Sequence, residues 1–140
     1  MAAGSFTFYN SGKLKIADNA IDLDGDTFIA LMTTSSYTPN VATQSNLTDI
    51  TNEVTDSDYS RQTLTSVTLS ESGGTVTFDA ADISFGSSVT ITSKYLVLFS
   101  STASNALLAY VDLDTGGGSV SSSNSTFQVT PSASGIATIT

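Results

Sequence analysis

The chain has 140 residues, a formal net charge of −9 and neither histidine nor cysteine. An acidic surface repels phosphate groups, so nucleic acids and membranes are not expected as partners. The chain cannot form disulfides, and it lacks the residue that most often acts as a general base, so we expect no enzyme activity and no cofactor. A hydrophobic fraction of 39% is enough for the core of one domain.

Aromatic residues occur close together near the N-terminus, at Phe6, Phe8 and Tyr9. We assign residues 1–9 to an N-terminal arm and residues 10–140 to a single β-rich domain. Exposed aromatic side chains are unusual on a soluble monomer, so the arm is expected to dock either on its own core or on a neighbouring molecule. The sequence leaves both possibilities open.

Two segments in the first half of the chain favour short helices. Residues 13–20 fit a helix slightly better than a strand, because Leu14 and Ala17 recur at helical spacing. Residues 46–54 are expected to form one or two helical turns, and residues 35–44 between the two segments are expected to form a loop.

Most of the remaining chain has the composition of β-strands, with many Val, Ile, Thr, Phe and Tyr residues. Short runs of these residues alternate with turn residues, as at Gly73 and Gly74. This spacing favours an antiparallel β-sandwich or a jelly-roll-like small barrel, so we predict a mainly β fold with one or two short helices. The expected strands are residues 21–24, 27–32, 64–69, 75–78, 89–91, 94–99, 106–113, 119–120, 126–129 and 136–139.

Three aspartates surround a glycine at Asp22, Asp24, Gly25 and Asp26. A calcium-binding EF-hand loop needs glycine at its sixth position and glutamate at its twelfth. Counted from Asp22, both positions hold threonine. No metal site is therefore predicted, and Asp22 and Asp24 are expected to face solvent on either side of a buried Leu23.

The sequence signals for other kinds of catalytic site are unspecific. A Ser–Lys pair would have to use Lys13, Lys15 or Lys94, and none of these lies in a recognisable motif. Two carboxylates can hydrolyse glycosides without histidine, but the thirteen acidic residues define no particular pair. A carboxylate glycosidase remains a third hypothesis. It would be supported by substrate turnover that is lost when a specific Asp or Glu is replaced.

The order of several motifs along the chain resembles that in a group of small, β-rich virion proteins of tailed phages. The resemblance covers most of the chain from about Tyr9 to the end and departs from the group at residues 56–58, where a glycine-rich turn is usual. It implies a β-rich structural component of the particle and supplies no catalytic residues. The matching segments are residues 22–34 (DLDGDTFIALMTT), 36–40 (SYTPN), 47–54 (LTDITNEV), Tyr59, 78–85 (FDAADISF), 94–99 (KYLVLF) and 105–112 (NALLAYVD).

From this resemblance we expect a capsid decoration (cement) protein on the exterior of the virion, made in the host cytoplasm. It would stabilise the head by bridging subunits of the major capsid protein, as a homo-oligomer for which a trimer is the expected state. Aromatic residues are enriched in interface cores. The residues expected to contact partners are Phe6, Phe8, Tyr9, Tyr37 and Pro39.

A tail or fibre-associated module that binds a host glycan or receptor is the alternative. Exposed aromatic rings beside amides or carboxylates suit sugar binding, and Tyr37, Tyr59 and Asn40 are the candidates for such a site. A glycan array and a cell-binding assay separate the two hypotheses, because a cement protein is expected to show no binding in either.

Overall fold

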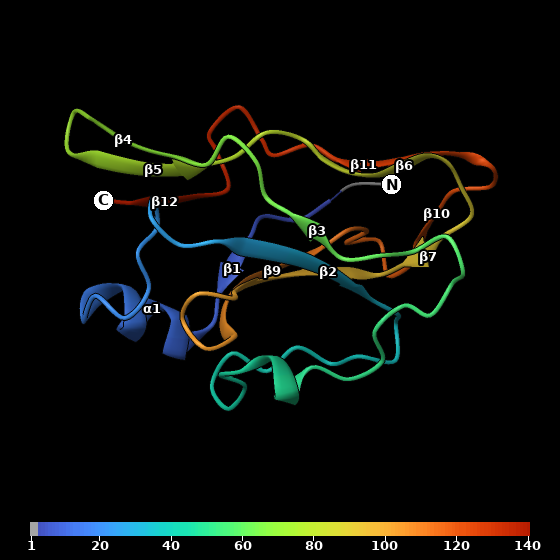
Figure 1. Cartoon of the computed structure of the whole chain (residues 1–140), viewed down its shortest axis with the longest axis horizontal. Helices are drawn as coiled ribbons and strands as arrows, with labels where there is room; N and C mark the ends of the chain where they lie inside the picture. The colour runs from blue at the N-terminus through green and yellow to red at the C-terminus, as the bar shows by residue number, and fades with distance from the viewer. Residues whose placement is uncertain (1–2) are drawn as a thin grey trace.

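Five strands form a central antiparallel sheet in the computed structural model, which describes residues 3–140 (Figure 1). The first two residues of the expected N-terminal arm lie outside the described residues. The arm docks on its own domain, because β1 pairs with β9. In spatial order the strands are β1 (Thr7–Phe8), β9 (Ala106–Asp112), β8 (Tyr95–Ser100), β2 (Phe28–Thr33) and β3 (Gln62–Thr63).

A second layer of smaller antiparallel sheets lies over one face of the central sheet (Figure 1). The predicted mainly β, antiparallel sandwich is confirmed, and the sheets keep open edges and do not close into a barrel. The second layer contains a three-stranded sheet of β4 (Thr68–Ser72), β5 (Thr75–Asp79) and β12 (Ala137–Ile139) and a two-stranded sheet of β6 (Ile83–Val89) and β11 (Ser125–Val129). A further two-stranded sheet at its end consists of β7 (Thr92–Ser93) and β10 (Val120–Ser121).

The main hydrophobic core fills the space between these two layers. Phe28 from the central sheet meets Phe78 from β5 edge to face, with ring centroids 5.4 Å apart. Further along the sandwich, Phe85 contacts Phe127 in the same way and stacks on Tyr59. Aromatic pairs of this kind contribute about 0.5–1.5 kcal/mol beyond the area that they bury.

A long loop and a helix cover the other face of the central sheet, so the sheet is buried on both sides (Figure 1). The loop carries a 3-10 turn, η1 (Leu47–Asp49), whose capping residue Asn46 accepts a hydrogen bond from the Thr48 backbone N–H. The helix α1 (Asn10–Ala17) lies against β9. A Cβ at Gly12 would be 2.8 Å from the backbone oxygens of Leu107 and Leu108, so glycine permits this close approach.

Several local elements differ from their predicted form. Residues 21–24 bury alternate side chains as expected, but they form a turn, because the Asp22 carboxylate accepts hydrogen bonds from the backbone N–H groups of Asp24 and Gly25. The helix predicted at residues 13–20 lies three residues earlier, and the one predicted at 46–54 is the single turn η1. Of the strand expected at 64–69, only residues 68 and 69 belong to a strand, β4, and residues 64–67 connect β3 to β4. Within residues 3–140, no helix is long and apolar enough to cross a membrane.

Candidate interaction surface

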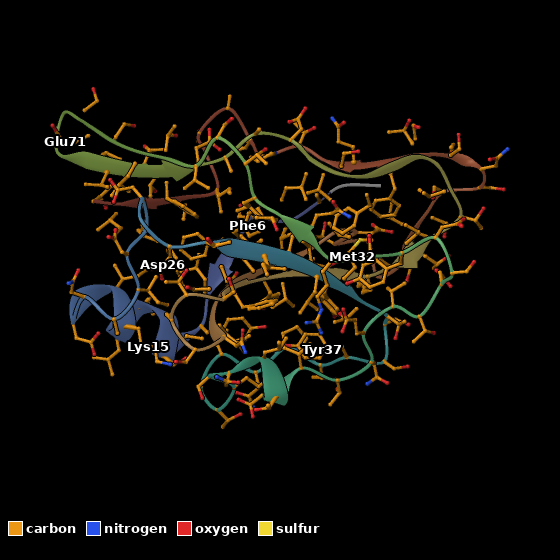
Figure 2. All side chains as sticks on the ribbon, in the orientation of Figure 1. Phe6, Lys15, Asp26, Met32, Tyr37 and Glu71 are labelled. Atoms are coloured by element: carbon orange, nitrogen blue, oxygen red, sulfur yellow. The ribbon has the colours of Figure 1, made fainter. Side chains whose placement is uncertain are left out.

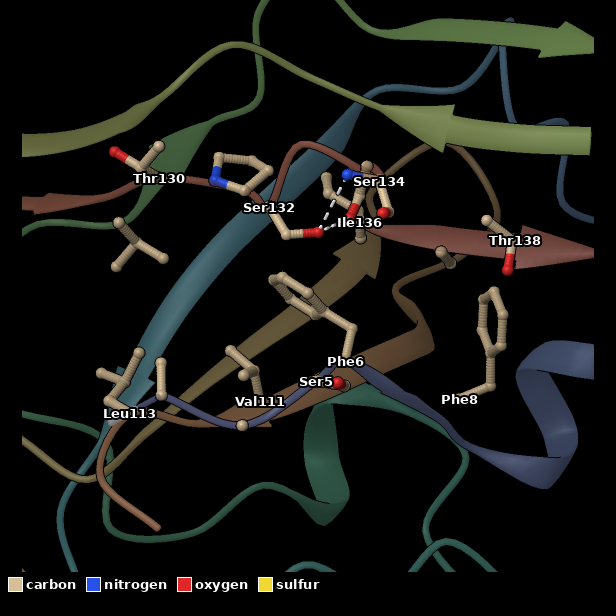
Figure 3. A pocket seen from close by; sticks show the side chains of 16 residues that line it. Ser5, Phe6, Phe8, Val111, Leu113, Thr130, Ser132, Ser134, Ile136 and Thr138 are labelled. Atoms are coloured by element: carbon tan, nitrogen blue, oxygen red, sulfur yellow. Dashed lines mark hydrogen bonds between the residues drawn. The ribbon is translucent and has the colours of Figure 1, made fainter. Parts of the chain in front are cut away.

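A groove of about 460 Å³ lies at the open side of the sandwich (Figure 3). The N-terminal segment, residues 3–8, and the end of β9 form one wall. Residues 129–138 form the other wall. In Figure 3, Phe6 lies below Ser132 and Ile136, and Phe8 lies below Thr138. The groove is therefore the gap between the two layers at the edge where the sandwich does not close.

Backbone pairing with β9 holds the first wall of the groove. Thr7 pairs with Tyr110 and Phe8 with Ala109, and the Gly4 N–H donates a hydrogen bond of 2.8 Å to the Asp112 carbonyl oxygen. Phe6 and Phe8 lie on the same side of this segment because side chains alternate along an extended strand. Both rings pack against the main core, yet both keep exposed area in the groove.

A hydrogen-bonded turn forms the second wall. The Ser132 hydroxyl donates to the Gly135 carbonyl oxygen and accepts from the Ser134 N–H, at 3.1 and 3.2 Å. Gly135 has a φ of +83°, and a Cβ there would lie 2.9 Å from the Phe78 carbonyl oxygen. The Ile136 N–H donates to that same oxygen, so the turn is held closely against β5.

The groove is uncharged although the protein is strongly acidic. None of its described lining residues has an ionisable side chain. Residues 1–12 and 115–140 contain no Asp, Glu, Lys or Arg, so all thirteen acidic and four basic residues fall between them. Residues 3–8 and 129–138 face each other across the groove, so this part of the surface carries no ionisable side chain on a protein with a net charge of −9. This distribution of charge is visible in the sequence alone.

Free sheet edges border the neutral groove on both sides. β1 is the outer strand of the central sheet, and β12 is the outer strand of the three-stranded sheet above it. The outer side of an edge strand presents N–H and C=O groups that no neighbouring strand pairs. The groove thus combines apolar rings, side-chain hydroxyl groups and backbone hydrogen-bonding groups, which suits contact with another polypeptide.

Two of the five residues predicted to contact partners, Phe6 and Phe8, lie in this groove. Pro39 lies in the loop that covers the opposite face of the central sheet, where it is partly exposed. Tyr9 and Tyr37 have 0% and 1% of their surface exposed. A side chain without accessible surface cannot touch a partner, so for Tyr9 and Tyr37 this burial corrects the sequence-based prediction.

The two buried tyrosines connect the N-terminal segment to the covering loop. Their hydroxyl oxygens are 2.7 Å apart, and the Tyr37 hydroxyl donates to Gln44 Oε1 at 2.6 Å. Tyr9 must therefore donate its proton to Tyr37. Burial raises the pKa of both hydroxyls, so the pair stays neutral. Figure 2 shows Tyr37 on the side of the central sheet away from β5.

The residues considered for a glycan site make internal contacts. The Tyr59 hydroxyl donates to Glu53 Oε1 at 2.8 Å and accepts a hydrogen bond from the Met32 N–H. The Asn40 side chain accepts from the Ala42 N–H within its own loop. Within residues 3–140, no group of three or more acidic side chains is placed to hold a metal ion.

Glu53 joins Tyr59 to Arg61 in a partly buried network. Arg61 donates two hydrogen bonds of 2.7 Å to the carboxylate, and its guanidinium lies 5.7 Å from the centre of the Phe99 ring. These bonds from Arg61 are the largest cause of the lowered pKa of Glu53; partial burial opposes them. The network fastens residues 53–61 to the central sheet.

We expect Glu53→Gln to destabilise the protein at pH 7 by about 1 kcal/mol, an amount limited by the exposure of the ion pair. A carboxyl group with a lowered pKa in the folded state stabilises the fold above its unfolded pKa of about 4.3, and this contribution is lost as the pH falls through the folded value. Urea unfolding at pH 7 and pH 3 should show a smaller difference from wild type at pH 3. Glu71→Gln, on the exposed β4–β5 hairpin, is the control; an equal loss there would contradict this explanation.

No family model, curated protein or solved structure matches this chain. The fold and the surface together define a mainly β sandwich that is open at one side, with an uncharged apolar groove along the opening.

Proposed function

We propose that this chain is a structural protein that acts by binding other protein surfaces, and in particular a decoration protein of a tailed-phage capsid. The observation that carries the proposal is the neutral groove between two free sheet edges, which contains Phe6 and Phe8. The motif order described above supplies the phage assignment. In this role the groove would contact major capsid protein at the junctions between shell subunits, on the outside of the head.

Such a surface can bind a partner through apolar contact, and its lack of charge favours this contact. Apolar contact contributes about 25 cal/mol for each Å² removed from water. The net charge of −9 keeps many copies soluble before they bind, and an uncharged groove can close on a partner without desolvating an ion. An oligomer that engages several subunits dissociates far more slowly than a single contact would.

Particles that contain this protein test the proposal. We expect a stoichiometric band on gels and density over the outer shell junctions in electron cryomicroscopy. Particles stripped of the protein should open at a lower temperature, and adding the purified protein should restore the original value. Ser134→Lys, which places a charge in the groove, should fail to restore it, whereas Ser72→Lys on the distant β4 edge should succeed. Particles without the band would refute the proposal.

The glycan-binding alternative has less support. It depended on exposed aromatic rings, and Tyr37 is buried while the hydroxyl of Tyr59 is bonded to Glu53. Binding to a glycan array, with no binding to capsids, would favour this alternative over the decoration role.

A further inference from the structure

β12 is a sheet edge without the features that usually protect one. Natural edge strands often carry charges that prevent pairing with another chain. The opposite edge of the same sheet, β4, carries Glu71. β12 consists of Ala137, Thr138 and Ile139, and no side chain after Asp114 is charged. Of the two edges of this sheet, β12 is therefore the one open to a further strand.

The side chains of β12 separate into an apolar face and a hydroxyl face. In the cross-strand register, Ala137 lies beside Phe78 and Ile139 beside Val76, and these side chains share the face that continues into the core. Thr138 lies beside Thr77 on the other face. Ile139 keeps 44% of its surface exposed, although it is on the apolar face.

This short strand is complementary to a second copy of itself. If two β12 strands pair antiparallel about an axis through Thr138, Thr138 faces Thr138 of the second copy, and Ala137 faces Ile139. Threonine pairs and apolar pairs are both favourable across strands. A two-fold contact requires the same patch on both molecules, and this register meets that requirement.

We propose that two copies of this chain associate through their β12 edges, so that their three-stranded sheets join into one continuous sheet across a two-fold axis. The groove of each copy lies beside this shared edge, because Ala137 and Thr138 line it. This association does not depend on the capsid partner proposed above.

Charge favours a second copy at this edge. Two molecules with a net charge of −9 repel each other, and the repulsion grows as their acidic residues approach. Neither β12 nor the described lining of the groove beside it has an ionisable side chain, so this contact brings together residues that carry no side-chain charge. A basic partner would instead be drawn to the acidic residues, which all fall between positions 18 and 114 and not on β12 itself.

Sedimentation velocity on the full chain over a range of concentrations tests the proposal. Wild type should form a dimer, and Thr138→Lys should raise the dissociation constant about tenfold or more, because two lysines then face each other on the axis. Ser70→Lys is a matched control: Ser70 lies opposite Thr77 in the same cross-strand row, on the other edge of the sheet, and the variant should still dimerise. Melting curves should confirm that both variants fold, since edge strands tolerate lysine.

A single-cysteine variant gives an independent test, because the chain has no cysteine of its own. Residues directly opposite in an antiparallel pair have Cβ atoms about 4.5–5.5 Å apart, close to the separation that a disulfide needs. Mild oxidation should convert Thr138→Cys into a covalent dimer and leave Ser70→Cys monomeric. A monomeric wild type at every concentration, a trimer, or equal cross-linking of both variants would overturn the proposal.

Discussion

Phe28→Ala is expected to destabilise the fold by about 3–5 kcal/mol, the cost of removing a large buried side chain and leaving a cavity. Phe28 has no exposed surface, and its ring contacts that of Phe78 edge to face. The two residues belong to different layers of the sandwich, β2 and β5, so the substitution removes a contact that holds the layers together. Total stabilities of 5–15 kcal/mol are usual, and such a loss would leave the variant only marginally folded.

Urea unfolding followed by circular dichroism measures this loss. Leu69→Ala is a suitable control. Leu69 belongs to β4 and lies opposite Phe78 of β5, but it keeps 39% of its surface exposed. The control should change the stability by less than about 1 kcal/mol. If both variants lost similar amounts of stability, the layers would not be held together through Phe28 and Phe78.

The strands were the most predictable feature of this protein, because each is a short run of β-branched and aromatic residues between turn residues. The expected strands at residues 75–78, 94–99, 106–113 and 126–129 lie within one or two residues of β5, β8, β9 and β11. The pairing of strands that are not neighbours in the chain was not predictable. β8 pairs with β2, and β12 pairs with β5, so partners far apart in the chain meet for reasons of overall packing that no local pattern encodes.

The covering loop was missed as a third layer, although the sequence contains a sign of it. Residues 95–99 are apolar at every position, whereas a strand with one solvated face alternates apolar and polar residues. Every residue of β8 after Tyr95 is buried, because the core lies on one side of the strand and the loop on the other.

The contact residues were only partly predictable, because burial depends on segments distant in sequence. Tyr9 and Tyr37 are 28 positions apart and cover each other, so neither the arm nor the loop alone indicates that these rings are inside. Phe6 and Phe8 keep exposed area because the sandwich ends beside them. The absence of Asp, Glu, Lys and Arg from residues 1–12 and 115–140 is the sign of the groove in the sequence, because most of its lining comes from these two segments.

Lys94→Met is expected to cost about 3 kcal/mol, because it breaks an ion pair that is largely inside the protein. The Lys94 side chain is 7% exposed, and its Nζ lies 2.8 Å from Asp112 Oδ1. The same Nζ donates a hydrogen bond to the Asp114 carbonyl oxygen and lies 5.6 Å from the centre of the Tyr95 ring. Methionine keeps most of the side-chain length but leaves the carboxylate and the carbonyl oxygen without this donor.

A double-mutant cycle separates the ion pair from general packing. Asp112→Asn alone leaves the ammonium group of Lys94 buried without its counter-charge, so it should also destabilise the protein. The combined variant Lys94→Met with Asp112→Asn should lose less than the sum of the two, because it leaves no unpaired charge inside. The coupling between Lys94 and Asp112 should persist in high salt, because Lys94 is shielded from solvent, whereas that between Glu53 and Arg61 should weaken. Strictly additive losses would mean that Lys94 stabilises the fold through its packing alone.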